Sequence, residues 1–166
     1  MASESLIAKC KELGIYLVTA ESLTAGLLGH EITAESGSSE VFIGGIVSYQ
    51  QSTKQELLGV SSALMGQQGT VDPEVAIQMA TGVRGRFAKV HQVDFERVVG
   101  ISTTGVAGPG ASEGKPPGTV FIGISSAAGD VVYAFQFKGD RASVRTQVVA
   151  SAIEGLREQL QLLEGC

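Results

Sequence analysis

A serine and a lysine are the residues of this chain whose types and positions best fit catalysis. Ser22 follows a β-favouring run at residues 15–20, and Lys54 follows a second such run at residues 41–50. A serine hydroxyl becomes a nucleophile when a base removes its proton, and a lysine with a lowered pKa is able to serve as that base. The amides of Thr24 and Ala25 could then stabilise an oxyanion. Each residue also has an ordinary interpretation, Ser22 as a helix N-cap and Lys54 as an exposed surface lysine.

The histidines, carboxylates and cysteines of the chain argue against other kinds of catalytic site. His30 is expected well inside a helix and His91 in a surface-like segment, so neither fits a general base. The sequence has no HxxEH pattern, no paired histidines and no clustered carboxylates, so we expect a metal-free reaction that needs no cofactor. Cys10 and Cys166 form no CxxC pair, which favours a reducing compartment over a disulfide framework.

Two segments could hold an anionic ligand. The loop GVAGPG at residues 105–110 lacks the Gly-Lys-Ser/Thr ending of a Walker loop, but a glycine-rich turn can present backbone amides to a phosphate. Arg141 and Arg145 lie about one helical turn apart, so both could contact one anion. A simple strand-leaving loop and solvated surface charge are the ordinary interpretations. Tyr49 could pack as an aromatic or offer its hydroxyl to a ligand.

The elements that must position these residues alternate between strands and helices. Runs at residues 15–20, 41–50 and 96–104 predict strands, the first and third without polar alternation and therefore buried on both faces. Helices are predicted over residues 2–13, capped by Ser3 or Ser5, over about 23–33, and from the N-cap Asp72 onward. Residues 119–139 predict a hairpin joined by AAGD, and a long amphipathic helix closes the chain. Its apolar face comprises Val144, Val148, Ala152, Ile153, Leu156 and Leu160.

This order predicts an α/β fold in which helices cover both faces of a mixed, mostly parallel sheet. Three predicted strand ends are unusually polar: TAESLTAG, SYQQSTK and STTGVAGPG. In open α/β sheets ligands bind beyond the carboxyl ends of the strands. If the three strands run parallel, the three segments meet at one edge of the sheet.

Bulk composition limits the partners. A length of 166 residues favours one domain, taken here as 1–166. The net charge of −5 argues against binding to nucleic acid. No segment has the length or hydropathy of a membrane span or a signal peptide, so we expect no membrane association and a soluble, cytoplasmic protein.

Six segments in order resemble the CinA C-terminal-domain family, the PncC-type nicotinamide mononucleotide deamidases. They are TAESLTAG, GGIVSYQQSTKQELLGV, GTVDPEVAIQMATG, STTGVAGPG, GKPPGTVFIGI and GDRASVR. The resemblance implies hydrolysis of nicotinamide mononucleotide, a small-molecule nucleotide substrate, to nicotinic acid mononucleotide and ammonia. It also implies a three-layer α/β/α sandwich and a homodimer. Relatives often carry a further N-terminal domain, and this sequence resembles the free-standing form.

The resemblance carries over residue by residue. The family's reactive serine falls on Ser22, and the tyrosine and lysine of its Tyr-Ser-Asn-x-x-Lys motif fall on Tyr49 and Lys54. Its glycine-rich loop is matched by Thr104, Gly105, Ala107, Gly108 and Pro109, and its Gly-Asp-Arg motif by Gly139, Asp140 and Arg141. The chain departs from the family pattern at Leu23 (usually cysteine), Ala25 (glycine), Gln50 and Gln51 (Ser-Asn) and Pro117 (valine).

The working hypothesis is a serine–lysine amidohydrolase. Lys54 takes the Ser22 proton, Ser22 attacks the carboxamide, and Arg141 with the loop amides holds the ribose phosphate. Glu21 orients either Lys54 or the ribose. Whether Ser22 forms an acyl-enzyme or positions a water stays open. The alternatives are a non-catalytic nucleotide-binding or interaction module of the same fold, and an amidohydrolase acting on another carboxamide.

Overall fold

A five-stranded mixed sheet lies at the centre of the computed structural model, which describes residues 5–165. The order of the strands is β2-β1-β3-β4-β5. β1 pairs in parallel with β2 and β3, whereas β3–β4 and β4–β5 are antiparallel, so β4 runs against the other four. The strands are β1 (Tyr16–Glu21), β2 (Phe42–Val47), β3 (Val98–Gly105), β4 (Thr119–Ser126) and β5 (Gly129–Gln136).

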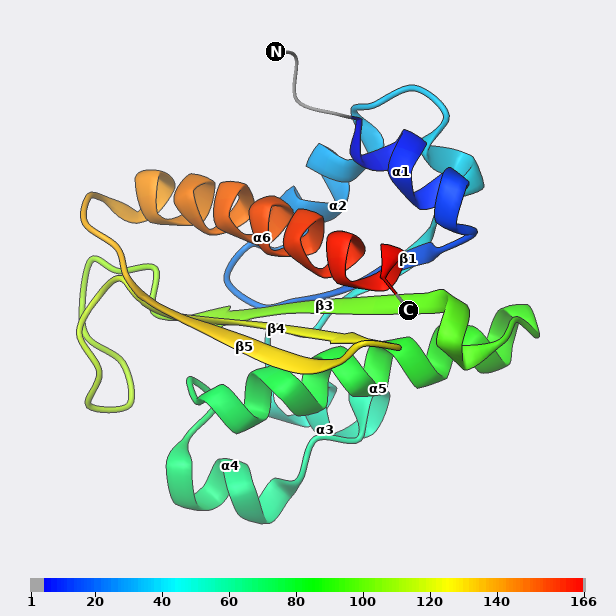
Figure 1. Ribbon diagram of the computed structural model, residues 1–166. Helices are drawn as coiled ribbons and strands as arrows, with labels where there is room; N and C mark the ends of the chain where they lie inside the picture. The colour runs from blue at the N-terminus through cyan, green and yellow to red at the C-terminus, as the bar shows by residue number, and fades with distance from the viewer. Residues whose placement is uncertain (1–4, 166) are drawn as a thin grey trace.

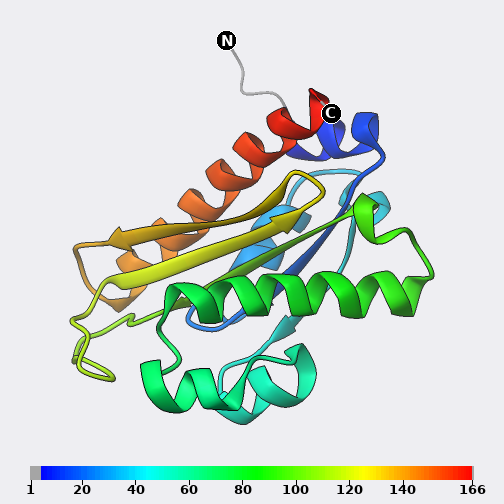
Figure 2. The same ribbon diagram turned by 60° about the horizontal axis from the view of Figure 1, so that its bottom comes forward.

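Helices cover both faces of the sheet (Figures 1 and 2). One face carries α1 (Leu6–Leu13), α2 (Leu27–Thr33) and α6 (Arg141–Glu164), and the other carries α3 (Gln51–Leu58), α4 (Ser62–Gln68) and α5 (Pro73–His91). Two short 3₁₀ helices directly precede strands: η1 (Ser38–Glu40) precedes β2, and η2 (Phe95–Arg97) precedes β3. The predicted three-layer α/β/α sandwich, with its late hairpin and long last helix, is confirmed. No helix within residues 5–165 is long and apolar enough to cross a membrane.

The core consists of two apolar clusters, one on each side of the sheet. Successive strand residues point to opposite faces, so Leu17 packs in the cluster that contains Leu156 of α6, and Val18 packs in the cluster that contains Met79 of α5. β1 and β3 are buried along almost their whole length, as predicted. β5 is an edge strand and buries only alternate residues in part.

Helix starts are predicted well where a capping side chain sits in the sequence. Ser5 caps α1 and Asp72 caps α5, whereas Ser3 lies outside the described residues. The prediction of a helix from about residue 23 is wrong, because α2 begins at Leu27. Ala25 and Gly26 have φ values of 47° and 99°, a left-handed conformation that an α-helix does not contain. Gly26 is the N-cap, so Ser22 does not cap this helix.

Candidate active site

The carboxyl ends of β1, β2 and β3 lie at one edge of the sheet because the three strands are parallel. The β3–β4 loop (residues 106–118) and the N-terminal end of α6 reach the same edge, on the left in Figure 1. These segments line an open cavity of about 240 Å³. Its lining comprises Ser22, Leu23, Tyr49, Thr70, Val71, Gly105, Val106, Ala107, Gly108, Gly110, Ser112 and Arg141.

Ser22 and Lys54 are in direct contact beneath this cavity. Lys54 Nζ lies 2.9 Å from Ser22 Oγ and donates a 2.6 Å hydrogen bond to the carbonyl oxygen of Ser48. Ser22 is half-buried and lines the cavity, whereas Lys54 is only 1% exposed. The interpretation of Lys54 as a surface lysine is therefore wrong.

The environment of Lys54 raises the fraction of its amine that is neutral. Burial lowers the pKa of Lys54 from 10.5 to about 8, and the negative charge of Glu113 acts in the opposite direction. Removing a cation from water disfavours its charged form, which is the dominant effect here. A lysine in this condition has a neutral fraction near pH 7 that is large enough to accept a proton from a serine hydroxyl.

The chain around Ser22 is held from two neighbouring elements. Ser22 N–H donates to the Thr103 carbonyl at 3.0 Å, which extends the β1–β3 ladder by one residue beyond Glu21. The hydroxyls of Thr24 and Thr103 are 2.8 Å apart. From α6, the Arg145 guanidinium donates to the carbonyls of Leu23 (2.9 Å) and Thr24 (3.2 Å). The hydroxyl of Ser22 is thus presented by a turn with a fixed path.

Glu21 serves a different purpose from the one predicted. It is 2% exposed, and its carboxylate accepts hydrogen bonds from the amides of Gly26 (3.2 Å), Leu28 (2.8 Å) and Gly29 (3.1 Å). A carboxylate at the N-terminus of a helix satisfies unpaired amides and interacts favourably with the helix dipole. Glu21 therefore caps α2 from the preceding strand, and the expectation that it orients Lys54 or a ribose is not met.

The predicted oxyanion donors need one correction. The Ala25 amide donates to the Ser22 carbonyl at 3.2 Å and closes the turn, so it is not available to a ligand. Within the described part of the chain, the amides of Leu23 and Thr24 have no hydrogen-bond acceptor. These two, which follow Ser22 directly, are the candidate donors. Leu23, in place of the family's usual cysteine, is 4% exposed and packs in the core.

Arg141 lies on the rim of the cavity. Its guanidinium donates to the Gly108 carbonyl at 2.8 Å and to the Tyr49 hydroxyl at 2.9 Å. These contacts join the start of α6 to the β3–β4 loop and to the end of β2. The predicted ligand-binding residues Gly105, Ala107 and Gly108 line the same cavity.

Two predicted ligand contacts are engaged elsewhere. Arg145 does not line the cavity, since it braces the turn after Ser22. Thr104 is buried, and its hydroxyl donates to the Thr70 carbonyl at 2.7 Å. The expectation that Arg141 and Arg145 share one anion is therefore not met in this conformation.

Sequence reasoning did not single out Glu113, which holds two residues of the cavity lining, Thr70 and Val71. Its carboxylate accepts from the amides of Thr70 (2.7 Å) and Val71 (3.0 Å) and from the Thr70 hydroxyl (2.8 Å). These bonds tie the β3–β4 loop to the segment between α4 and α5. No local sequence pattern predicts a contact between residues that are 43 positions apart.

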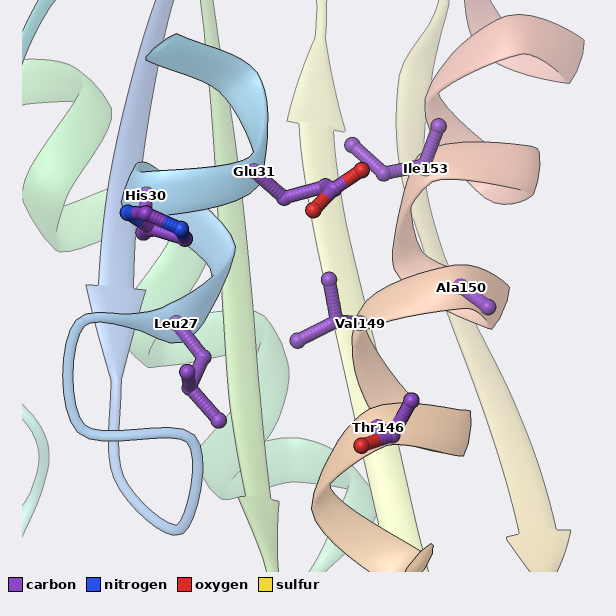
Figure 3. A pocket seen from close by; sticks show the side chains of 7 residues that line it. All are labelled: Leu27, His30, Glu31, Thr146, Val149, Ala150 and Ile153. Atoms are coloured by element: carbon purple, nitrogen blue, oxygen red, sulfur yellow. The ribbon is translucent and has the colours of Figure 1, made fainter. Parts of the chain in front are cut away.

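A larger cavity of about 410 Å³ lies elsewhere, between α2 and α6 (Figure 3). Its lining is mostly apolar, and its polar side chains are His30, Glu31 and Thr146. It contains no nucleophile paired with a base. No cluster of three or more metal-binding side chains is found in residues 5–165 either. The contact between Ser22 and Lys54 therefore marks the smaller cavity as the candidate active site.

Comparison with known proteins assigns this chain to a family. The sequence profile of the CinA C-terminal domain matches residues 1–160. The chain belongs to the CinA C-terminal domain family. CinA-like proteins of Acaryochloris marina and Frankia casuarinae are each 41% identical to it, over 95% and 87% of this chain. The chain spans 36% and 31% of the lengths of these two CinA relatives.

Solved structures of the CinA superfamily have the same fold. A superfamily protein from Escherichia coli superposes with a TM-score of 0.81 at 28% identity, covering 93% of this chain and 87% of the other. One from Klebsiella pneumoniae gives 0.81 at 26% identity, covering 94% and 96%. The CinA fold therefore extends across almost the whole chain.

Proposed function

We propose that this protein is a metal-free serine–lysine amidohydrolase that converts nicotinamide mononucleotide to nicotinic acid mononucleotide and ammonia. The observation that carries the proposal is the buried Lys54 amine, 2.9 Å from the hydroxyl of Ser22 at the wall of an open cavity. The choice of substrate rests on the resemblance of six segments to the deamidase family. The exposed cation Arg141 on the rim supports a substrate with an anionic group.

The first half of the reaction forms an acyl-enzyme. Lys54 Nζ takes the proton of Ser22, and Ser22 Oγ bonds to the carboxamide carbon while the π electron pair moves to the carbonyl oxygen. The amides of Leu23 and Thr24 stabilise the resulting oxyanion. When the tetrahedral intermediate collapses, the C–N bond breaks, and the nitrogen receives the proton from Lys54 and leaves as ammonia.

The second half returns the enzyme to its starting state. Water gives a proton to Lys54 and attacks the ester carbon, and the C–O bond to Ser22 then breaks. Ser22 Oγ recovers its proton from Lys54. The cycle consumes one water and releases one carboxylic acid and one ammonia, so no metal or redox cofactor enters the balance.

Arg141 and the loop amides hold the substrate in this proposal. The Arg141 guanidinium already donates to two neutral oxygens, those of Gly108 and Tyr49. A phosphate accepts stronger, charge-assisted hydrogen bonds from a guanidinium than a carbonyl or a phenol does. Bound phosphate would therefore replace one or both of these partners and recruit Tyr49 to the ligand.

The test is ammonia release from nicotinamide mononucleotide, with nicotinic acid mononucleotide identified by NMR. Ser22→Ala and Lys54→Met are expected to remain folded and to lose at least roughly 1,000-fold in kcat, as is usual when a paired nucleophile and base are removed. The exposed Lys138→Met is the matched control and is expected to keep full activity. Trapping of an acyl group on Ser22 would distinguish covalent catalysis from the positioning of a water.

Three other outcomes would point away from the proposal. Thermal stabilisation by nicotinamide mononucleotide without ammonia release would identify a nucleotide-binding module. Hydrolysis of a different carboxamide from a panel, with no turnover of the mononucleotide, would change the substrate. Near-wild-type turnover in Ser22→Ala or Lys54→Met would remove that residue from the mechanism.

A further inference from the structure

Ser48 carries a buried hydroxyl beside the proposed general base. Ser48 is 0% exposed, whereas its neighbours Val47 and Tyr49 are 49% and 52% exposed, so its side chain faces the protein interior, as Lys54 does. The Ser48 hydroxyl has no hydrogen-bond partner among the residues that the structure describes. A buried polar group without a partner is costly, and serine rather than alanine at such a position calls for a physical reason.

The Lys54 amine has one more N–H donor than it has hydrogen-bond acceptors around it. An ammonium carries three N–H donors, and two acceptors contact Lys54 Nζ, Ser22 Oγ at 2.9 Å and the Ser48 carbonyl at 2.6 Å. A neutral amine that accepts the Ser22 proton through its lone pair still has two N–H groups, and only the Ser48 carbonyl receives one of them. In both protonation states one N–H lacks an acceptor.

The two unsatisfied groups belong to residues that are already in contact. The carbonyl carbon and Cβ of Ser48 are bonded to the same Cα, and the carbonyl oxygen already lies 2.6 Å from Lys54 Nζ. No hydrogen bond fixes the orientation of the Ser48 hydroxyl, so rotation about Cα–Cβ is able to turn it toward the amine. The backbone of Ser48 is itself anchored, because its N–H donates to the Glu21 carbonyl at 2.8 Å.

We infer that Ser48 Oγ is the third hydrogen-bond partner of Lys54 Nζ and a positioning residue of the reaction. This inference rests on the proposed function. Ser48 holds the amine while Nζ carries the Ser22 proton to the departing ammonia, and again while it returns a proton from water to Ser22. Ser48 neither gains nor loses a proton in either half-reaction.

The inference predicts a combination of effects that a purely structural serine would not cause. Removing an acceptor from the ammonium destabilises the charged form, so the pKa of Lys54 falls further. The proton-carrying state is also less stable, so kcat falls although more of the base is neutral. Glu113 of the β3–β4 loop is the charged group that raises the pKa of Lys54, and the carboxylate of Glu21 is turned to the α2 amides. Neither carboxylate is altered by a change at Ser48.

The experiment compares Ser48→Ala and Ser48→Cys with the wild type. Cysteine keeps most of the volume but is a poor hydrogen-bond acceptor, so both variants are expected to behave alike. The pKa of Lys54 is measured by NMR in protein carrying ¹³Cε-lysine, with the signal assigned by its loss in Lys54→Met. Both variants are expected to lower this pKa by about one and to reduce kcat roughly tenfold at pH 9, with KM unchanged, the equivalent of one hydrogen bond to a charged group.

Ser102→Ala is the matched control for removal of a buried serine hydroxyl. Ser102 is 0% exposed and donates to the Ala76 carbonyl at 2.6 Å, so its loss is expected to reduce stability without moving the pKa of Lys54. An unchanged pKa of Lys54 together with an unchanged kcat in Ser48→Ala or Ser48→Cys would overturn the inference. If the wild type releases no ammonia, the proposed function fails, but the NMR titration still decides whether Ser48 binds the amine.

Discussion

Replacing Lys54 by methionine is predicted to stabilise the folded protein at neutral pH. The fully buried amine has a pKa of about 8, compared with 10.5 for an exposed lysine. Below pH 8 the folded state therefore holds its ammonium at a cost of about 3 kcal/mol relative to the unfolded chain. Methionine has a similar length and no charge, but it leaves the Ser48 carbonyl without a donor, a loss of about 1 kcal/mol. The net expectation is a gain of about 2 kcal/mol in the free energy of unfolding at pH 7.

The pH dependence of the stability difference between Lys54→Met and the wild type tests the sign of the effect of burying the amine, whatever its size. Between pH 8 and 10.5 the unfolded chain binds the lysine proton and the folded protein does not, so this group makes wild-type stability rise with pH. Lys54→Met lacks that rise. Relative to the wild type, the stability of Lys54→Met is therefore expected to fall by about 2.5 kcal/mol between pH 7 and pH 10, so the advantage at pH 7 becomes a slight disadvantage at pH 10.

Urea unfolding followed by circular dichroism at several pH values measures both quantities. Because both proteins are measured at each pH, the contributions of other groups that titrate in the same range cancel in the difference. The exposed Lys138→Met is the control, and its stability difference from the wild type is expected to be small and flat across the range. A Lys54→Met protein that is less stable than the wild type at pH 7, with a difference that does not change up to pH 10, would refute the reasoning.

The remaining predictions concern catalysis and the turn after β1. With nicotinamide mononucleotide, kcat/KM is expected to rise about tenfold per pH unit up to the pKa of Lys54, about 8, and then to level off; a profile that is flat between pH 6 and 8 would exclude Lys54 as the base. Arg141→Met is expected to raise KM for the mononucleotide about tenfold, but to leave KM for the phosphate-free riboside unchanged. Ala25→Gly is expected to raise the free energy of unfolding by about 0.5–1 kcal/mol, because glycine accepts the left-handed φ of 47° without strain. Glu21→Gln is expected to lower the free energy of unfolding by about 1–3 kcal/mol in urea unfolding and to leave KM unchanged, since its carboxylate is engaged by the amides of α2.

Much of the fold could be predicted because its signals are local. The buried strands β1 and β3 follow from apolar runs without polar alternation, and the start of α5 follows from Asp72 and Pro73. The start of α2 could not be found in this way. Its cap is the carboxylate of Glu21, which lies outside the helix on the preceding strand, and no capping pattern at the helix itself marks the position.

Residue types and their order along the chain were enough to predict the candidate site residues and the edge of the sheet at which they meet. Polar segments placed directly after parallel strands must meet, because such strands end at the same side. The contacts of each side chain became visible only in the folded protein: Lys54 enters the interior, Arg145 braces a turn, and Glu113 binds a segment 43 residues away. These contacts could not be predicted because burial and hydrogen-bond partners depend on the paths of loops that pack against each other, and such contacts produce no periodic pattern in the sequence.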